Sequence, residues 1–155
     1  MDGGAPTALV LDTAVYIHGA AGRLPSGLRD LLERSLLFHC AVALTELSVG
    51  VAAADPRSPH WTALRDHYTE LFAQIPETRL LTPDPQTFIE AGLVAGALAR
   101  LQGYQPHQRA ACLNDALIHL TAAKAGLPVL TANGGDFDLI QQLAPEGRFI
   151  AYRPD

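Results

Sequence analysis

Four acidic residues stand where predicted strands end or predicted helices begin: Asp12, Glu46, Asp115 and Asp136. Asp12 ends the first apolar, strand-like run of the chain, and Glu46 follows the second such run by a few residues. Asp115 opens a helical pattern, and Asp136 follows a later strand-like run by five residues. In an open α/β sheet, ligands bind beyond the carboxyl ends of the strands. The four carboxylates are therefore expected to meet at that edge.

A cluster of carboxylates has a chemical cost that cations would remove. Like charges held close together raise one another's pKa values and destabilise the fold. Hard oxygen ligands select Mg²⁺ or Mn²⁺. Two such ions would balance the charge of the four acids and leave a site ready to accept a phosphodiester, as in two-metal hydrolases. The sequence predicts that the four acids bind metal and carry catalysis.

Each acid also has a simpler interpretation when it is taken alone. Asp115 and Asp136 precede helical patterns, where Asp is often only an N-cap. Glu46 could be a solvated first-turn acid favoured by the helix dipole. Asp12 is harder to explain, because an acid that ends an apolar strand is desolvated unless it has a partner. Asp138 shares the local setting of Asp136 but is predicted to be a surface residue. The joint position of the four acids favours a site.

Polar residues beside the acids are candidates for a supporting role. Thr13 and Thr131 lie at predicted strand ends, where a hydroxyl could contact a carboxylate or a phosphate, or could be an ordinary strand or cap residue. Asn133 could brace the loop before the fourth acid, or could simply favour a turn. His119 follows the third acid by one helical turn, so its ring could orient that carboxylate or modify metal binding.

The elements that must position these residues alternate along the chain. Short apolar runs predict strands at Thr7–Leu11, Leu36–Val42, Val129–Thr131 and Arg148–Tyr152, with a weaker candidate at Arg79–Leu81. Helical patterns lie between them: one capped by Ser26 through Arg34, one capped by Thr45 and beginning at Glu46, Trp61–Gln74, Pro85 to about Leu101, and one capped by Asn114 or Asp115 and ending before Gly126. This alternation predicts a three-layer α/β/α domain with a central parallel sheet. No boundary divides residues 1–155, so one domain is expected.

Composition places the chain among packed globular proteins, with 48% hydrophobic and 17% charged residues. No apolar run is long enough to span a membrane. Met1–Gly4 carries an acid in place of the basic start of a secretory signal, and Cys40 and Cys112 are predicted to be buried free thiols. A cytoplasmic location is expected. The net charge of −5 is unusual for a nucleic-acid enzyme, although all but one of the eleven basic residues are Arg and metal ions would neutralise the acids.

Four short motifs around these acids resemble those of PIN domains, in the same order. They are Asp12–Val15, Thr45–Gly50, Asn114–Ile118 and Thr131–Phe137, the last of which resembles the T-x-N-x-x-D-F ending of VapC-like toxins. The resemblance implies a Mg²⁺- or Mn²⁺-dependent endoribonuclease, commonly the toxin of a type II toxin–antitoxin pair. Two residues depart from the family pattern: Ala14 replaces the usual Asn or Ser, and His119 replaces a small residue.

The predicted activity is hydrolysis of RNA by metal-bound water, giving 5′-phosphate and 3′-hydroxyl ends. The expected partners are the RNA substrate, a small antitoxin whose Arg side chain enters the acidic cleft, and a second copy of the chain. The small residues Gly92, Ala95, Gly96 and Ala99 would form the dimer interface, unless they serve ordinary core packing.

Other functions remain open at this point. A non-catalytic Mg²⁺-binding receiver would need a lysine at a late strand end, but Lys124 is the only lysine and falls within a helix. A phosphatase would have a second Asp two residues after Asp12, where Ala14 stands. A PIN-like binding scaffold would not need intact acids. A metal-free ribonuclease would use two of the six histidines as acid and base, but their spacing pairs none of them.

Overall fold

A computed structural model describes residues 7–155, so the Met1–Gly4 segment lies outside the described residues. Five strands form one sheet in the order β3-β2-β1-β4-β5, and every pairing is parallel. The strands are β1 (Ala8–Leu11), β2 (Leu36–Cys40), β3 (Leu80–Leu81), β4 (Val129–Thr131) and β5 (Phe149–Ala151). The strand order reverses between β1 and β4, so the carboxyl ends of these two strands flank the switch point where ligands bind.

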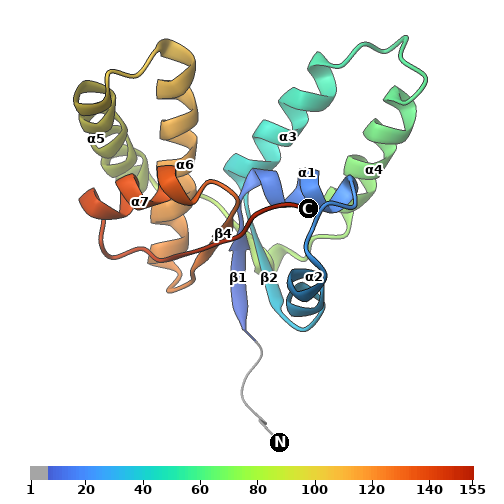
Figure 1. The fold of residues 1–155 in the computed structure, drawn as a ribbon, viewed down its shortest axis with the longest axis horizontal. Coiled ribbons are helices and arrows are strands. Elements are labelled where there is room, and N and C mark those ends of the chain that lie inside the picture. Colours follow the sequence, from blue (N-terminus) through green and yellow to red (C-terminus); the bar gives the residue numbers. More distant parts are fainter. Residues whose placement is uncertain (1–6) are drawn as a thin grey trace, which may run out of the picture.

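Helices surround the sheet in the predicted α/β/α arrangement. They are α1 (Thr13–Ala20), α2 (Ser26–Glu33), α3 (Ala41–Ala53), α4 (Trp61–Ala73), α5 (Pro85–Gln102), α6 (Pro106–Lys124) and α7 (Gly134–Leu143), with a short 3-10 turn at Glu77–Arg79. Helices α3 and α4 form one arm, and α5 and α6 form the other (Figure 1). Both arms rise beyond the carboxyl ends of β1 and β2. None of the helices within residues 7–155 is long and apolar enough to cross a membrane.

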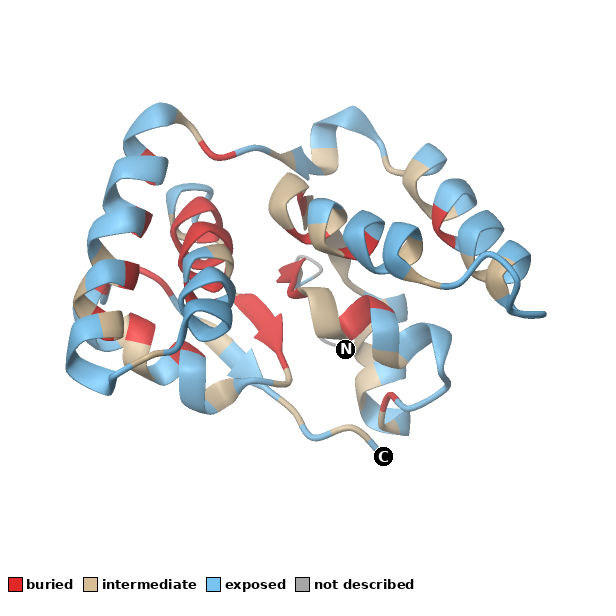
Figure 2. Cartoon of the chain, turned by 90° about the horizontal axis from the view of Figure 1, so that it is seen from above, coloured by how far each residue is buried: buried red, intermediate tan, exposed pale blue. Residues whose placement is uncertain are grey.

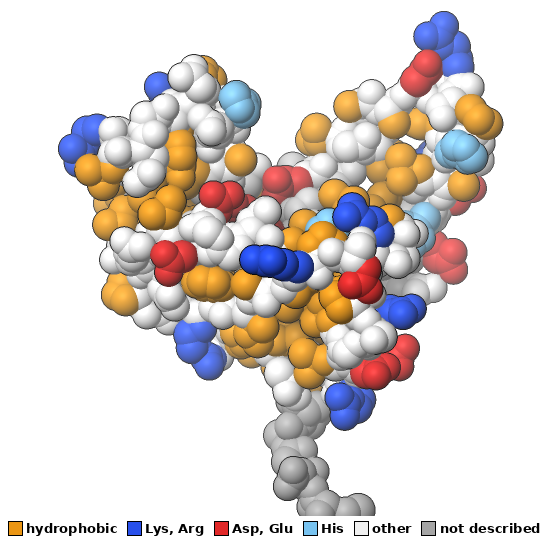
Figure 3. All heavy atoms as spheres, viewed as in Figure 1, with side chains coloured by type: hydrophobic (Ala, Val, Ile, Leu, Met, Phe, Trp, Pro, Cys, Tyr) orange, Lys and Arg blue, Asp and Glu red, His pale blue; other side chains and the backbone are white. Residues whose placement is uncertain are grey.

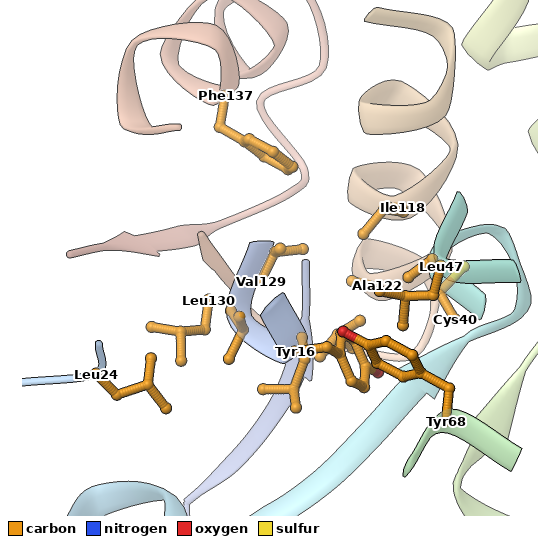
Figure 4. Packing of buried hydrophobic residues seen from close by; sticks show 14 residues of the cluster. Tyr16, Leu24, Cys40, Leu47, Tyr68, Ile118, Ala122, Val129, Leu130 and Phe137 are labelled. Atoms are coloured by element: carbon orange, nitrogen blue, oxygen red, sulfur yellow. The ribbon is translucent and has the colours of Figure 1, made fainter. Parts of the chain in front are cut away.

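Apolar side chains from the sheet and the helices form two packed clusters. Around β1 and β4, residues such as Val10 and Leu130 are fully buried among side chains of α1, α3, α4 and α6 (Figure 4). A second cluster joins α5, α6 and α7 through residues that include Leu98 and Ile140. Burial is highest at the strands and on the helix faces turned toward them (Figure 2). Cys40 and Cys112 are buried free thiols, as predicted.

Two helices begin earlier than the sequence prediction placed them. β2 ends at Cys40, which has an extended backbone and directly precedes α3, so Glu46 lies in the second turn of that helix. Thr45 does not cap α3, because its hydroxyl donates to the carbonyl oxygen of Ala41 inside the helix. α6 begins at Pro106, so Asp115 lies in the middle of that helix. The first-turn and N-cap interpretations of these two acids are therefore wrong.

The remaining helix predictions agree closely with the structure. α4 and α5 lie within one residue of their predicted bounds, and Gly103 ends α5 in the left-handed region at φ 66°. Ser26 is the first residue of α2, whereas the cap position belongs to Pro25. A proline suits the start of a helix because it donates no backbone hydrogen bond and its φ is already helical.

Candidate active site

Asp12 is fixed between β1 and β4 by hydrogen bonds to its backbone and to both carboxylate oxygens. Its backbone N–H donates to the carbonyl oxygen of Leu130 at 3.0 Å. Its Oδ1 accepts from the N–H of Thr13 at 2.8 Å, and its Oδ2 accepts from Oγ1 of Thr131 at 2.8 Å. The side chain is only 2% exposed. One carboxylate is thus held in a single orientation at the switch point of the sheet.

Thr13 links Asp12 to Glu46. Its backbone N–H binds Asp12, and its hydroxyl donates to Oε1 of Glu46 at 2.7 Å. Glu46 is half-buried on α3, although it lies 33 residues beyond Thr13 in the sequence. The first turn of α1 therefore positions two acids that come from different elements.

Thr131 also positions the segment that carries Asp136. Its hydroxyl donates to Asp12 and accepts from the backbone N–H of Asn133 at 2.9 Å. The carbonyl oxygen of Asn133 in turn accepts from the N–H groups of Asp136 and Phe137, both at 3.1 Å. Asn133 acts through its backbone here, since its side chain forms no cap of α7. Asp136 is the third residue of α7 and is exposed.

The four acids are close enough to perturb one another. Burial, and after it the charges of Asp12, Glu46 and Asp136, raise the pKa of Asp115 to about 8. Burial also raises the pKa of Asp12, as do the charges of Glu46 and Asp136, whereas the bonds from Thr131 and Thr13 lower it. The ion pairs within residues 7–155 involve other acids, so no Lys or Arg there neutralises these four. The structure brings together all four residues chosen from the sequence.

These acids lie at the bottom of a cleft between the two arms. In the space-filling view, acidic side chains appear on the floor of the hollow that separates the arms (Figure 3). A cavity of about 110 Å³ opens beside Asp115 and Asp136, and its other lining residues are Tyr104, Gln108, Ala111, Cys112 and Ile140. The cleft is thus acidic and has a small side cavity between α6 and α7.

His119 points away from the acids. Its Nε2 donates to the carbonyl oxygen of Ala144 at 3.0 Å, and its ring packs against Phe137 with centroids 6.1 Å apart. Gly147 lies against the same ring, where a Cβ would overlap it. His119 therefore does not hydrogen bond to Asp115 in this structure. The imidazole ring of His119 fits at this position because Gly147 has no side chain that would overlap it.

Asp138 lies on the surface, as the sequence prediction required. It is exposed, and its Oδ2 accepts from Nε2 of Gln142 one turn later on α7. The charge of Asp138 does not contribute to the raised pKa values of Asp12 and Asp115. The two acids of this segment thus have different surroundings, and only Asp136 faces the cluster.

Tyr104 and Gln108, which line the cavity, were missed in the sequence analysis. The signal lay in Pro106, which is favoured in the first turn of a helix. With α6 begun at that residue, Gln108, Cys112 and Asp115 fall at helical spacing on one face. The late helix start predicted from the sequence concealed this face.

The donor set suits a hard divalent cation, although the side chains are not drawn together around one. Within residues 7–155, no three acidic, histidine or cysteine side chains stand at metal-ligand spacing. Clustered carboxylates with raised pKa values are nevertheless the oxygen ligands that such ions prefer. Mg²⁺ commonly binds through one or two carboxylates and keeps several waters, so it does not require a closed cage of protein ligands.

Comparisons with known proteins place the fold. No family model and no curated protein sequence matches the chain. A VapBC toxin–antitoxin structure from Mycobacterium tuberculosis matches with a TM-score of 0.62 and 27% identity, covering 95% of this chain and 100% of that one. FitAcB from Neisseria gonorrhoeae gives a TM-score of 0.68 at 18% identity, covering 92% and 96%. DNA-bound VapBC from Salmonella typhimurium gives 0.62 at 22%, covering 94% and 98%.

These structural neighbours agree with the parallel sheet and the surrounding helices of this chain. The likeness extends over nearly the full length of both partners in each comparison. The chain thus has a PIN-like α/β/α fold and resembles VapC-like toxins in structure.

Proposed function

We propose that this protein is a Mg²⁺- or Mn²⁺-dependent endoribonuclease and the toxin of a type II toxin–antitoxin pair. The observation that carries the proposal is the convergence of four acids at the switch point of the sheet, with the pKa of Asp115 raised to about 8. Such a cluster is costly for the fold unless cations bind it. Its position at the floor of an open cleft suits a substrate as long as RNA.

The residues of the site have separable roles in this proposal. Asp12, Asp115 and Asp136 hold the metal, while Glu46 either joins them or orients the attacking water. Thr13 and Thr131 fix the acids by donating to Glu46 and Asp12. When bound, Mg²⁺ or Mn²⁺ lowers the pKa of water and stabilises charge on the phosphate during in-line attack. Water attacks in place of the 2′-hydroxyl, so the products carry 5′-phosphate and 3′-hydroxyl ends.

The test of this activity is cleavage of RNA by the purified protein with Mg²⁺ or Mn²⁺. We expect EDTA to abolish cleavage and added metal to restore it, and we expect 5′-phosphate ends on the products. Undiminished cleavage in EDTA, or 2′,3′-cyclic phosphate ends, would contradict the mechanism and favour a histidine-based ribonuclease. The structure gives little support to that alternative, because His18 and His39 bind Tyr152 and Tyr16 instead of each other.

A receiver-like module is also less well supported than the nuclease. Lys124 lies in the last turn of α6 and binds Asp84, which is not one of the four acids. It therefore cannot serve as the strand-end lysine of a receiver site. A binding scaffold would tolerate loss of any one acid, so substitution of Asp115 by Asn separates the scaffold from the nuclease.

An antitoxin partner follows from the neighbours and from the charge of the cleft. The similar structures are toxin–antitoxin systems, and some are bound to DNA. In this chain the four acids have no basic partner among residues 7–155, so an Arg from an antitoxin could bind them with two parallel hydrogen bonds. Expression of the chain alone should slow growth, and co-expression of a neighbouring antitoxin gene should restore it. An active, folded protein without effect on growth would contradict the toxin role and leave the nuclease intact.

The second protein partner is another copy of the chain. Ala91, Ala95 and Leu98 turn one face of α5 toward α6, and Ile89 and Leu93 are exposed on the other side. Gly92 and Gly96 on that outer side have no atom near the position of a Cβ. Of the four small residues named from the sequence, Ala95 thus serves core packing and Ala99 is half-buried, whereas the two glycines leave room for a second helix to approach closely.

A further inference from the structure

The cavity beside the acids is lined in a way that the cleavage mechanism does not require. It lies between α6 and α7, and Tyr104 from the connection between α5 and α6 borders it. Asp115 and Asp136 belong both to this cavity and to the acidic cluster. Any group that fills the cavity therefore lies next to the phosphate that the acids would act on.

The size and charge of the lining indicate what kind of group would fit. A volume of about 110 Å³ is well below that of pockets for drug-sized ligands, which span roughly 300–1,000 Å³, so one ring fits better than a larger molecule. The lining contains two carboxylates and no Lys or Arg, which disfavours a phosphate. Burial raises the pKa of the Cys112 thiol to about 11, so this wall is neutral and apolar together with Ile140. A flat, uncharged ring matches these surroundings.

Hydrogen bonds within the chain hold the two distinctive lining residues. The backbone N–H of Tyr104 donates to Ala99 at 3.1 Å, and its carbonyl oxygen accepts from Nε of Arg109 at 3.0 Å. Gln108 accepts the backbone N–H of Gln105 through Oε1 at 2.8 Å. That bond occupies the amide oxygen of Gln108 and leaves the two Nε2 donors without a partner in residues 7–155. The lining therefore combines an aromatic residue with an amide whose oxygen is held and whose two N–H donors have no partner in residues 7–155.

We propose that this cavity receives one unstacked base of the RNA, from a nucleotide adjacent to the scissile phosphate. Tyr104 provides the surface on which the base stacks, and Nε2 of Gln108 donates to acceptor atoms on the base edge. Stacking on aromatic side chains and hydrogen bonding to base edges are the usual means of reading single-stranded RNA. The inference rests on the proposed ribonuclease activity and adds the residues that select the cleavage site.

An antitoxin side chain is a weaker candidate for the same cavity. A basic side chain would be drawn to the carboxylates, and it would gain nothing from the donors of Gln108 because it offers no acceptor. A base provides acceptors such as N7 and O6 of guanine. The chemistry of both Tyr104 and Gln108 is satisfied together by a base.

The experiment measures which bases flank the cleaved bond in a randomised single-stranded RNA pool. We expect the wild type to prefer particular bases at one flanking position, and Tyr104→Leu to lose roughly tenfold of that preference. Tyr104→Phe, which keeps the ring, should retain it. Gln108→Glu keeps an oxygen for the Gln105 N–H but replaces the donors by an acceptor, so the preference should shift toward bases that offer an amino group. Gln102→Glu adds the same charge at an exposed position outside the lining and should match the wild type.

The outcomes separate this inference from the activity on which it rests. A wild type that cleaves no RNA overturns both proposals. If folded Tyr104→Leu and Gln108→Glu variants cleave with the wild-type base profile, the base pocket alone is overturned. The same conclusion holds if these variants keep the wild-type profile but bind the antitoxin more weakly. If Tyr104→Leu fails to fold, Gln108→Glu alone still tests the base pocket. A Gln108→Glu variant with the base profile of the wild type would contradict the proposal.

Discussion

Asp115 holds a proton at neutral pH that the proposed metal ion would have to displace. Its pKa is raised to about 8 by burial first, and then by the charges of Asp12, Glu46 and Asp136. A divalent cation binds the ionised carboxylate, so metal binding should release this proton. Metal affinity is therefore expected to increase as the pH rises toward 8. This acid couples the electrostatics of the fold to the chemistry of the site.

The stability of the metal-free protein should show the same titration. The unfolded chain releases the Asp115 proton near 3.8, whereas the folded protein keeps it up to about pH 8. The folded state binds more protons across that window, so its free energy of unfolding falls as the pH rises, by roughly 1 kcal/mol per pH unit, and levels off above it. Denaturant unfolding from pH 5 to 9 in EDTA measures this slope. Asp115→Asn should flatten the slope, and an identical slope in that variant would contradict the assignment.

Asp136 and Asp138 offer a matched comparison within one helix. Asp136 contributes charge to the acidic cluster, whereas Asp138 is exposed and binds only Gln142. Asp136→Asn should lower RNA cleavage by more than about 100-fold, because even residues that merely support a metal ligand commonly cost 10–100-fold when replaced. Asp138→Asn should cleave as the wild type does. The measurement is the cleavage rate against Mg²⁺ concentration, and an inactive Asp138→Asn beside a fully active Asp136→Asn would show that the fourth acid is misplaced.

The start of α7 is the element on which the position of Asp136 depends. Gly134 lies so close to β5 that a Cβ added to it would be 2.9 Å from the Cβ of Ala151, whereas Gly135 has open space around it. Gly134→Ala should therefore push α7 away from β5 and destabilise the protein by about 1–3 kcal/mol. Cleavage should fall with it, since Asp136 moves with the helix. Gly135→Ala is the control and should change neither thermal unfolding nor cleavage appreciably. Equal stability of the two variants would argue against close packing at this point.

Most strands and the starts of α4 and α5 could be predicted closely from the sequence. Apolar runs identified β1 and β4, and Asp12 marks the end of β1, because a buried strand has a clear pattern that a charged residue interrupts. The starts of α3 and α6 were placed too late. Cys40 caps α3 without a side-chain hydrogen bond, and polar residues in the first turns of α6 conceal its apolar face. The start of α3 thus has no side-chain signal, whereas that of α6 has Pro106, which the polar first turns obscured.

The sequence predicted the residues of the acidic site but not those that line the cavity beside it. Four acids could be assigned because their residue type and their place after strands imply one edge of the sheet. The roles of Thr13 and Thr131 depend on which hydroxyl reaches which carboxylate, and only the packed structure places those atoms. The ring of His119 turns toward Ala144 for the same reason: tertiary packing decides which side of a buried helix residue finds a partner.

At the scale of the whole molecule, each arm contributes acids to the cleft. Glu46 belongs to α3 in one arm, and Asp115 belongs to α6 in the other. Asp12, at the end of β1, lies between the two arms. Its carboxylate accepts a hydrogen bond from the hydroxyl of Thr131 on β4. All four acids come from one chain, so no second copy is needed to supply them. In a dimer formed through α5, each subunit would therefore carry its own set of four acids.

The α5 face gives a direct test of self-association. Leu93 is 71% exposed, and Gly92 and Gly96 beside it have no neighbouring atom at the Cβ position. A two-fold dimer would bury this face against itself, so Leu93→Glu would place like charges on both sides and should convert a dimer to a monomer. Because the substitution is at the surface, it should change the free energy of unfolding of the monomer by no more than about 0.5 kcal/mol. The monomer should also keep metal-dependent cleavage. Val49, 62% exposed on α3, provides the control: Val49→Glu should leave the dimer intact. Analytical ultracentrifugation measures both masses, and a monomeric wild type, or a dimer that survives Leu93→Glu, would contradict the interface.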